Sequence, residues 1–167
     1  MAGPEELDLL LARVGTYGGH GINHEDQPFH GELAVESVLG RGVRWTFRAT
    51  GIDGTTYHEE QSWVARDETG ALCLWSVNGY EPHCGRHVRR HGAGVAGTIA
   101  TLVFGRGDPG DPAQYRIEIA MDLWPNGDVG YRYAWGLPNG PFEPRSAVRM
   151  ALEVDRAPHL DDASARA

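Results

Sequence analysis

The residues best suited to chemistry in this chain are His58 and Glu60, which lie two positions apart. Residues i and i+2 of a strand share a face, so an imidazole and a carboxylate would stand side by side and could act as acid and base. In a poorly solvated cavity the pKa values of both groups would shift. The pair could then transfer protons without a cofactor. The spacing fits equally a structural hydrogen-bonded pair, or an outward pair with Tyr57 and Trp63 packed inside.

A second group of chemically capable residues comprises His83, Cys84, His87 and His91. On a helix His87 and His91 would lie one turn apart, whereas on a strand the same spacing is about 13 Å, too far to bind one ion. Nearby glycines disfavour a helix. We therefore expect a polar strand or loop that holds no metal, with a free thiol at Cys84.

Arg145 and Arg149 lie four positions apart in a segment that we expect to be the last strand. If both face inward, they would suit a carboxylate or a phosphate. In the alternative, both arginines meet solvent and the other row faces inward. That row consists of Ser146, Val148, Met150 and Leu152.

The composition narrows the classes of function. The chain has 167 residues, 41% hydrophobic and 23% charged, which fits one domain with a real core. Its net charge of −8 argues against a nucleic-acid or anionic-membrane partner. All 15 cationic residues are arginine, which excludes a Schiff-base lysine. Cys73 and Cys84 neither require nor forbid a disulfide, and with no signal peptide visible we expect a cytoplasmic protein.

The elements that must position these residues are mostly strands. Apolar and polar residues alternate from Val43 to Thr50, Asp53-Gly54 forms a tight turn, and residues 55–65 return as a second strand. An amphipathic helix is expected from Pro4 to Val14. The other expected strands cover residues 15–21, 29–38, 71–78, 97–104, 115–123, 129–135 and 145–154, with a polar strand or loop up to His91. About ten short antiparallel strands indicate an up-and-down barrel or a sandwich.

Three motifs, in order along the chain, carry a resemblance to a known family. Residues 15–21 read Gly-Thr-Tyr-Gly-Gly-His-Gly and resemble the Gly-x-Trp-x-Gly-x-Gly signature of the nitrobindins, with Tyr17 in place of the tryptophan. Gln27-Pro28-Phe29 and His58-x-Glu60-x-x-Trp63-Val64 resemble further family motifs. Nitrobindins are haem-binding barrels of the calycin type, related in shape to fatty-acid-binding proteins. The resemblance, over residues 10–152, implies an all-β, calycin-like barrel with the helix over one opening.

The chain differs from that family at the position of the residue that binds the haem iron. The resemblance places Ala147, or a near neighbour, where nitrobindins hold haem iron through a histidine of the last strand. No histidine occurs between His91 and His159. We therefore expect no cofactor; haem binding would need His20, His30, His58 or a residue of segment 83–91 as a replacement ligand.

The sequence predicts one barrel domain, residues 1–156, with a mobile tail at 157–167. We expect it to bind a small, largely apolar molecule inside the barrel, an anionic group on that molecule being left open. The expected lining residues are Tyr17, Trp45, Phe47, Trp75, Tyr131, Tyr133, Trp135, Arg145 and Arg149. The alternative is a cofactor-free isomerase or cyclase with His58 and Glu60 as acid and base. A homodimer is left open, and no nucleic acid or membrane is expected as a partner.

Overall fold

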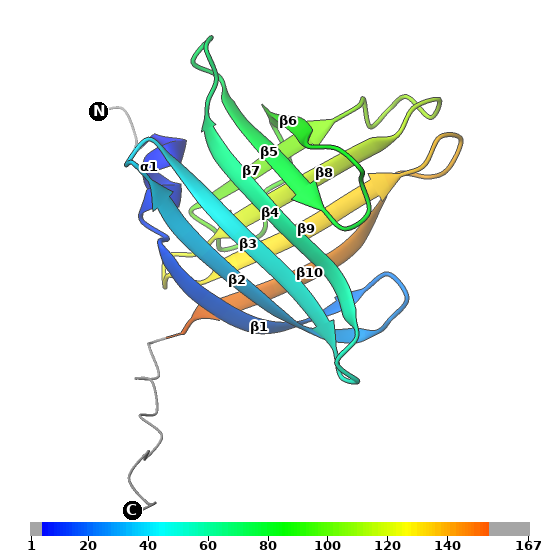
Figure 1. The fold of residues 1–167 in the computed structure, drawn as a ribbon, viewed down its shortest axis with the longest axis horizontal. Helices are drawn as coiled ribbons and strands as arrows, with labels where there is room; N and C mark the ends of the chain where they lie inside the picture. Colours follow the sequence, from blue (N-terminus) through cyan, green and yellow to red (C-terminus); the bar gives the residue numbers. More distant parts are fainter. Residues whose placement is uncertain (1–4, 154–167) are drawn as a thin grey trace, which may run out of the picture.

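Ten antiparallel strands close into one barrel, in which each strand pairs with its neighbours in sequence and β1 pairs with β10 (Figure 1). The computed structural model describes residues 5–153. Its elements are α1 (Glu6–Leu11), β1 (Gly15–Asn23), β2 (Pro28–Val38), β3 (Gly42–Gly51), β4 (Thr56–Arg66), β5 (Leu72–Asn78), β6 (Gly85–Arg90), β7 (Ala100–Arg106), β8 (Arg116–Leu123), β9 (Val129–Gly136) and β10 (Glu143–Leu152). The prediction of an all-β up-and-down barrel with a short N-terminal helix is confirmed.

The largest departures from the predicted boundaries are in two elements. The helix is shorter than predicted, because the chain leaves the helical conformation after Ala12, and Val14 is half exposed rather than packed. β7 begins at Ala100 and not at residue 97, because Gly97 has a φ of +83°, which a strand does not accept. The predicted tail at 157–167 lies outside the described residues. No helix within residues 5–153 is long and apolar enough to cross a membrane.

The helix α1 covers one end of the barrel, beside the ends of β2 and β3 (Figure 1). Leu10 is fully buried there and contributes to the core. The carboxylate of Glu6 accepts a hydrogen bond from the Arg89 guanidinium at 2.7 Å, and the Tyr17 hydroxyl donates to the backbone oxygen of Arg13 at 2.9 Å. These contacts hold the helix and the segment after it over this end of the barrel.

The glycines of β1 are explained by the closure of the barrel. A Cβ atom at Gly21 would lie 2.5 Å from the backbone oxygen of Ala147, and one at Gly19 would lie closer still to the backbone oxygen of Arg149. β1 therefore approaches β10 too closely for a side chain at these positions. The motif that carries the family resemblance thus has a structural role in this chain.

The inner face of the barrel changes character along its axis. On β4 the inward row runs from Val64, through Ser62 and Glu60, to His58 at the end farthest from α1. On β5 the inward row runs likewise from Leu72 to Asn78. The interior is therefore a packed apolar core below α1 and becomes polar towards the opposite end.

Candidate functional site

A cavity of about 670 Å³ occupies the end of the barrel opposite α1. The connections that follow β1, β3, β5, β7 and β9 gather at this end. Aromatic side chains form much of its wall, among them Phe29, Tyr57, Tyr115, Tyr133 and Trp135. Flat aromatic faces of this kind can stack on an apolar ligand.

The predicted lining residues divide into those at the cavity, those in the core and those on the outer face, where Trp75 and Arg149 lie. Tyr133, Trp135 and Arg145 line the cavity. Four others are buried in the packed core below it, where they are structural: Tyr17, Trp45, Phe47 and Tyr131. The prediction that Trp75 faces the interior is wrong, because Leu74 and Ser76 take the inward positions of β5. Trp75 instead lies opposite Trp63 across the β4–β5 pair, on the outer face.

The side chains of His58 and Glu60 point into the barrel. The Nε2 atom of His58 lies 3.4 Å from Oε2 of Glu60, and the Ser62 hydroxyl donates to Oε1 at 2.5 Å. The Glu60 side chain is fully buried, while that of His58 is 14% exposed and lines the cavity. His58 also stacks on Tyr80, with ring centroids 5.8 Å apart. The imidazole therefore stands between the carboxylate and the cavity.

The electrostatics of this pair follow from burial and its partners. Burial opposes ionisation of Glu60, but the hydrogen bond and charge of His58, together with Ser62, bring the pKa of that carboxyl below its usual value. Burial first, and the nearby Glu60 carboxylate second, raise the pKa values of Tyr131 and Tyr133. Both phenols therefore remain protonated at neutral pH and stay available as hydrogen-bond donors.

The histidines between residues 83 and 91 are spread over different environments. His87 is fully buried inside the barrel, and its Nε2 atom lies 2.9 Å from the Ser76 hydroxyl. His83 lies 3.2 Å from the Arg106 guanidinium at the cavity mouth, and His91 is exposed. Within residues 5–153 no three His, Cys, Asp or Glu side chains converge as metal ligands. Both cysteines are free thiols.

The side chains of the two arginines of β10 differ in direction: Arg145 reaches the interior cavity and Arg149 lies on the outer face. Ser146, Val148 and Met150 face inward, so Arg149 faces outward and pairs with Asp128 at 2.8 Å. The hypothesis of an inward arginine pair is therefore wrong. Arg145 reaches the cavity because the register shifts between Pro144 and Ser146. Its guanidinium lies 4.1 Å from the centroid of the Trp135 ring and 3.5 Å from the carboxylate of Glu143.

The cavity does not reproduce the haem ligation that the family resemblance implies. The inward residue at the relevant part of β10 is Ser146, and Ala147 faces outward, which corrects its placement from the sequence. Of the replacement ligands considered, His20 and His30 contact each other on the outer face of the barrel, with ring centroids 5.1 Å apart. His58 lines the cavity, but its Nε2 atom is directed at Glu60. Ser146, His20, His30 and His58 therefore do not provide the axial ligand that haem iron would need in this cavity.

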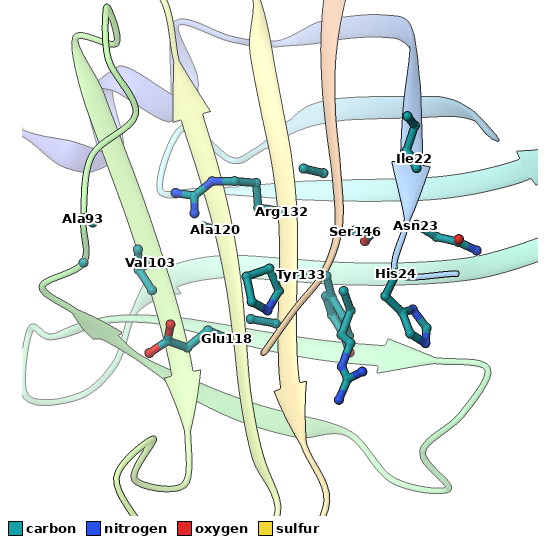
Figure 2. Close-up of a pocket in the computed structure, with 15 residues that line it drawn as sticks. Ile22, Asn23, His24, Ala93, Val103, Glu118, Ala120, Arg132, Tyr133 and Ser146 are labelled. Atoms are coloured by element: carbon teal, nitrogen blue, oxygen red, sulfur yellow. The ribbon is translucent and has the colours of Figure 1, made fainter. Parts of the chain in front are cut away.

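A second cavity of about 360 Å³ lies at the outer faces of β8, β9 and β10 (Figure 2). Ala93, in the connection between β6 and β7, forms part of its edge, and Ala120 and Arg132 form part of its floor. The Arg132 guanidinium is already bound to the Asp122 carboxylate at 2.6 Å. The charge of Arg132 in this outer groove is therefore already neutralised.

Asn78 is one of the lining residues that the sequence analysis does not identify. It ends the inward row of β5 and is 8% exposed. The available signal was the change from leucine to serine and asparagine along the inward positions 72, 74, 76 and 78. The same change runs along β4, so polar residues at inward positions mark the open end.

The fold and the cavity define a class: closed ten-stranded antiparallel barrels that enclose a cavity at one end. No protein-family model matches the chain, and no curated protein is detectably similar in sequence. Among solved structures, the crystal structure of Rv2717c from M. tuberculosis is similar, with a TM-score of 0.66 and 12% sequence identity. The match covers 92% of this chain and all of that chain. This similarity shows a shared barrel fold.

Proposed function

We propose that the barrel binds one small, largely apolar molecule in its interior cavity. The observation that carries the proposal is the cavity of about 670 Å³ with aromatic walls and a few polar side chains. Ligand pockets typically measure about 300 to 1,000 Å³ and have such a lining. An anionic group on the ligand has one candidate anchor, Arg145, whose charge is already shared with Glu143.

Two neighbouring positions of β10 provide a test. Ser146 lines the interior cavity and also borders the outer groove, whereas Ala147 is exposed and lines the outer groove but not the interior cavity. We expect the neutral dye N-phenyl-1-naphthylamine to bind the wild-type protein in a one-to-one ratio with a rise in fluorescence. Ser146→Trp should weaken this binding, because the indole occupies part of the cavity, and Ala147→Trp should retain it. Binding that survives Ser146→Trp unchanged would refute the proposal, and loss in Ala147→Trp would assign the dye to the outer groove.

A second candidate is a cofactor-free isomerase or cyclase. The observation that favours it is the inward pair, with His58 at the cavity wall and its Nε2 atom 3.4 Å from a buried carboxylate. An imidazole backed by a carboxylate can take a proton from a bound substrate and return it at another atom. The aromatic walls would hold the substrate in a reactive conformation.

The carrier and the enzyme predict different results with the small-molecule extract of the source cells. Incubation in D₂O, followed by mass spectrometry, would show whether any compound gains deuterium or changes in amount. An enzyme would cause such a change, Glu60→Gln would stop it, and the variant would still bind the dye. An extract that the wild-type protein leaves unchanged would contradict the enzyme and favour the carrier.

A further inference from the structure

Asn78 presents an unused hydrogen-bond donor at the cavity wall. Its Oδ1 atom accepts hydrogen bonds from the backbone N–H groups of Tyr80 at 2.9 Å and Glu81 at 3.0 Å. These two bonds fix which end of the amide is oxygen, so the Nδ2 group is turned to the other side. That Nδ2 atom is shielded from solvent and has no hydrogen-bond partner.

Glu81 presents an unused acceptor in the same turn. One of its carboxylate oxygens pairs with the Arg106 guanidinium, while Oε2 is buried without a partner. Glu81 lines the cavity, as Asn78 does. A buried polar atom without a partner is unfavourable, so a bound group that satisfies both atoms would be selected over one that satisfies neither.

The charges around the cavity oppose a carboxylate at this position. Arg106 is matched by Glu81, and Arg145 is matched by Glu143. The Glu60 carboxylate, with its lowered pKa, lies behind His58 without an arginine partner. The polar end of the cavity therefore offers no unmatched guanidinium to an anionic ligand group, which would also lie beside the carboxylate of Glu81.

We infer that the polar end of the ligand is an uncharged group that both accepts and donates hydrogen bonds, such as a carboxamide or lactam on an aromatic ring system. Its carbonyl oxygen would accept from Nδ2 of Asn78, and its N–H would donate to Oε2 of Glu81. The inference rests on the proposed function, since it names the class of molecule that the same cavity takes.

Three naphthalenes with the same ring and different substituents test this inference. Displacement of N-phenyl-1-naphthylamine gives the affinity of 2-naphthamide, 2-methylnaphthalene and 2-naphthoate for the wild-type protein. We expect the amide to bind about tenfold more tightly than the hydrocarbon, the effect of one or two net hydrogen bonds. The carboxylate should bind least well.

Asn78→Asp removes the Nδ2 hydrogen-bond donor and keeps the oxygen that stabilises the turn. An aspartate keeps the oxygen that accepts from Tyr80 and Glu81 but has no N–H group, so the preference for the amide should disappear. The matched control is Asn126→Asp, since Asn126 forms a similar turn, with Oδ1 accepting from the N–H of Asp128, and does not line the cavity. The control should keep the preference.

Several results would overturn the inference. Tightest binding of 2-naphthoate, equal binding of the amide and the hydrocarbon, or an unchanged preference in Asn78→Asp would each show that the polar end takes another group. In those cases the dye would still bind and the proposed function would stand. Failure of the dye and of all three naphthalenes to bind would remove both.

Discussion

Acidification should destabilise the barrel through His87, which is held uncharged in the interior. Burial, followed by the nearby Arg106 guanidinium, lowers the pKa of this imidazole to about 4. The ordinary value in an unfolded chain is about 6.5. Between these two values the unfolded chain takes up a proton that the folded protein does not, so the free energy of unfolding decreases as the pH falls.

The size of the effect follows from the interval between the two pKa values. Each pH unit within it corresponds to about 1.4 kcal/mol. From pH 7 to pH 5 His87 should therefore lower the free energy of unfolding by about 2 kcal/mol, and by about 3 kcal/mol over the full interval. Above about pH 6.5 the residue is neutral in both states and makes no pH-dependent contribution.

Urea unfolding, followed by tryptophan fluorescence at pH 7 and pH 5, measures this loss. His87→Gln retains a polar side chain beside Ser76 but does not titrate, and His87→Leu serves if the glutamine variant fails to fold. Either variant should lose about 2 kcal/mol less than the wild type between the two pH values. His91→Gln is the control, because His91 is exposed. If the His87 variant lost as much stability between pH 7 and pH 5 as the wild type, the assignment of a neutral imidazole to His87 would be wrong.

Three further predictions concern the barrel itself. Gly19→Ala should cost about 3 kcal/mol or more in thermal unfolding, because its Cβ would collide with backbone of β10, whereas Gly79→Ala has open space and should change little. Asp122→Asn should cost about 1 to 2 kcal/mol in urea unfolding, because the partly solvated Arg132 guanidinium loses its buried charged partner. Asp128→Asn, at the more exposed pair with Arg149, should cost less than about 1 kcal/mol. Glu6→Gln should weaken the attachment of α1 by about 1 kcal/mol and speed amide exchange at Leu10 without affecting the dye. Equal destabilisation by Gly19→Ala and Gly79→Ala, or by Asp122→Asn and Asp128→Asn, would contradict these assignments. Unchanged amide exchange at Leu10 in Glu6→Gln would contradict the role of Glu6.

The fold could be predicted from local features. The hairpin of β3 and β4 was placed to within one residue because alternation and the Asp53-Gly54 turn are both encoded locally, and Gly54 has the φ of +84° that the turn needs. The sequence of residues 83–91 is compatible with either a strand or a loop. Gly85–Arg90 form a strand because they pair with β5 and β7, which no local signal shows.

The inner face could be predicted for β3, whose alternating apolar residues are the buried ones, but not for β5 or β10. On β10 both rows were plausible, and the choice depends on the register shift next to Arg145 and on pairing with β1 and β9. On β5 Cys73 and Trp75 are as apolar as Leu72 and Leu74, so periodicity could not show which pair faces inward. Such choices depend on long-range pairing rather than on composition.

Amide NMR of the protein titrated with N-phenyl-1-naphthylamine tests the central claim most directly. The account predicts saturable shifts at Phe29, Tyr57, His58 and Asn78, which line the interior cavity and not the outer groove, and little change at Leu10 below α1. Shifts gathered instead around the outer groove, at Ala93 and Ala120, or no saturable shift at all, would contradict binding in the barrel interior.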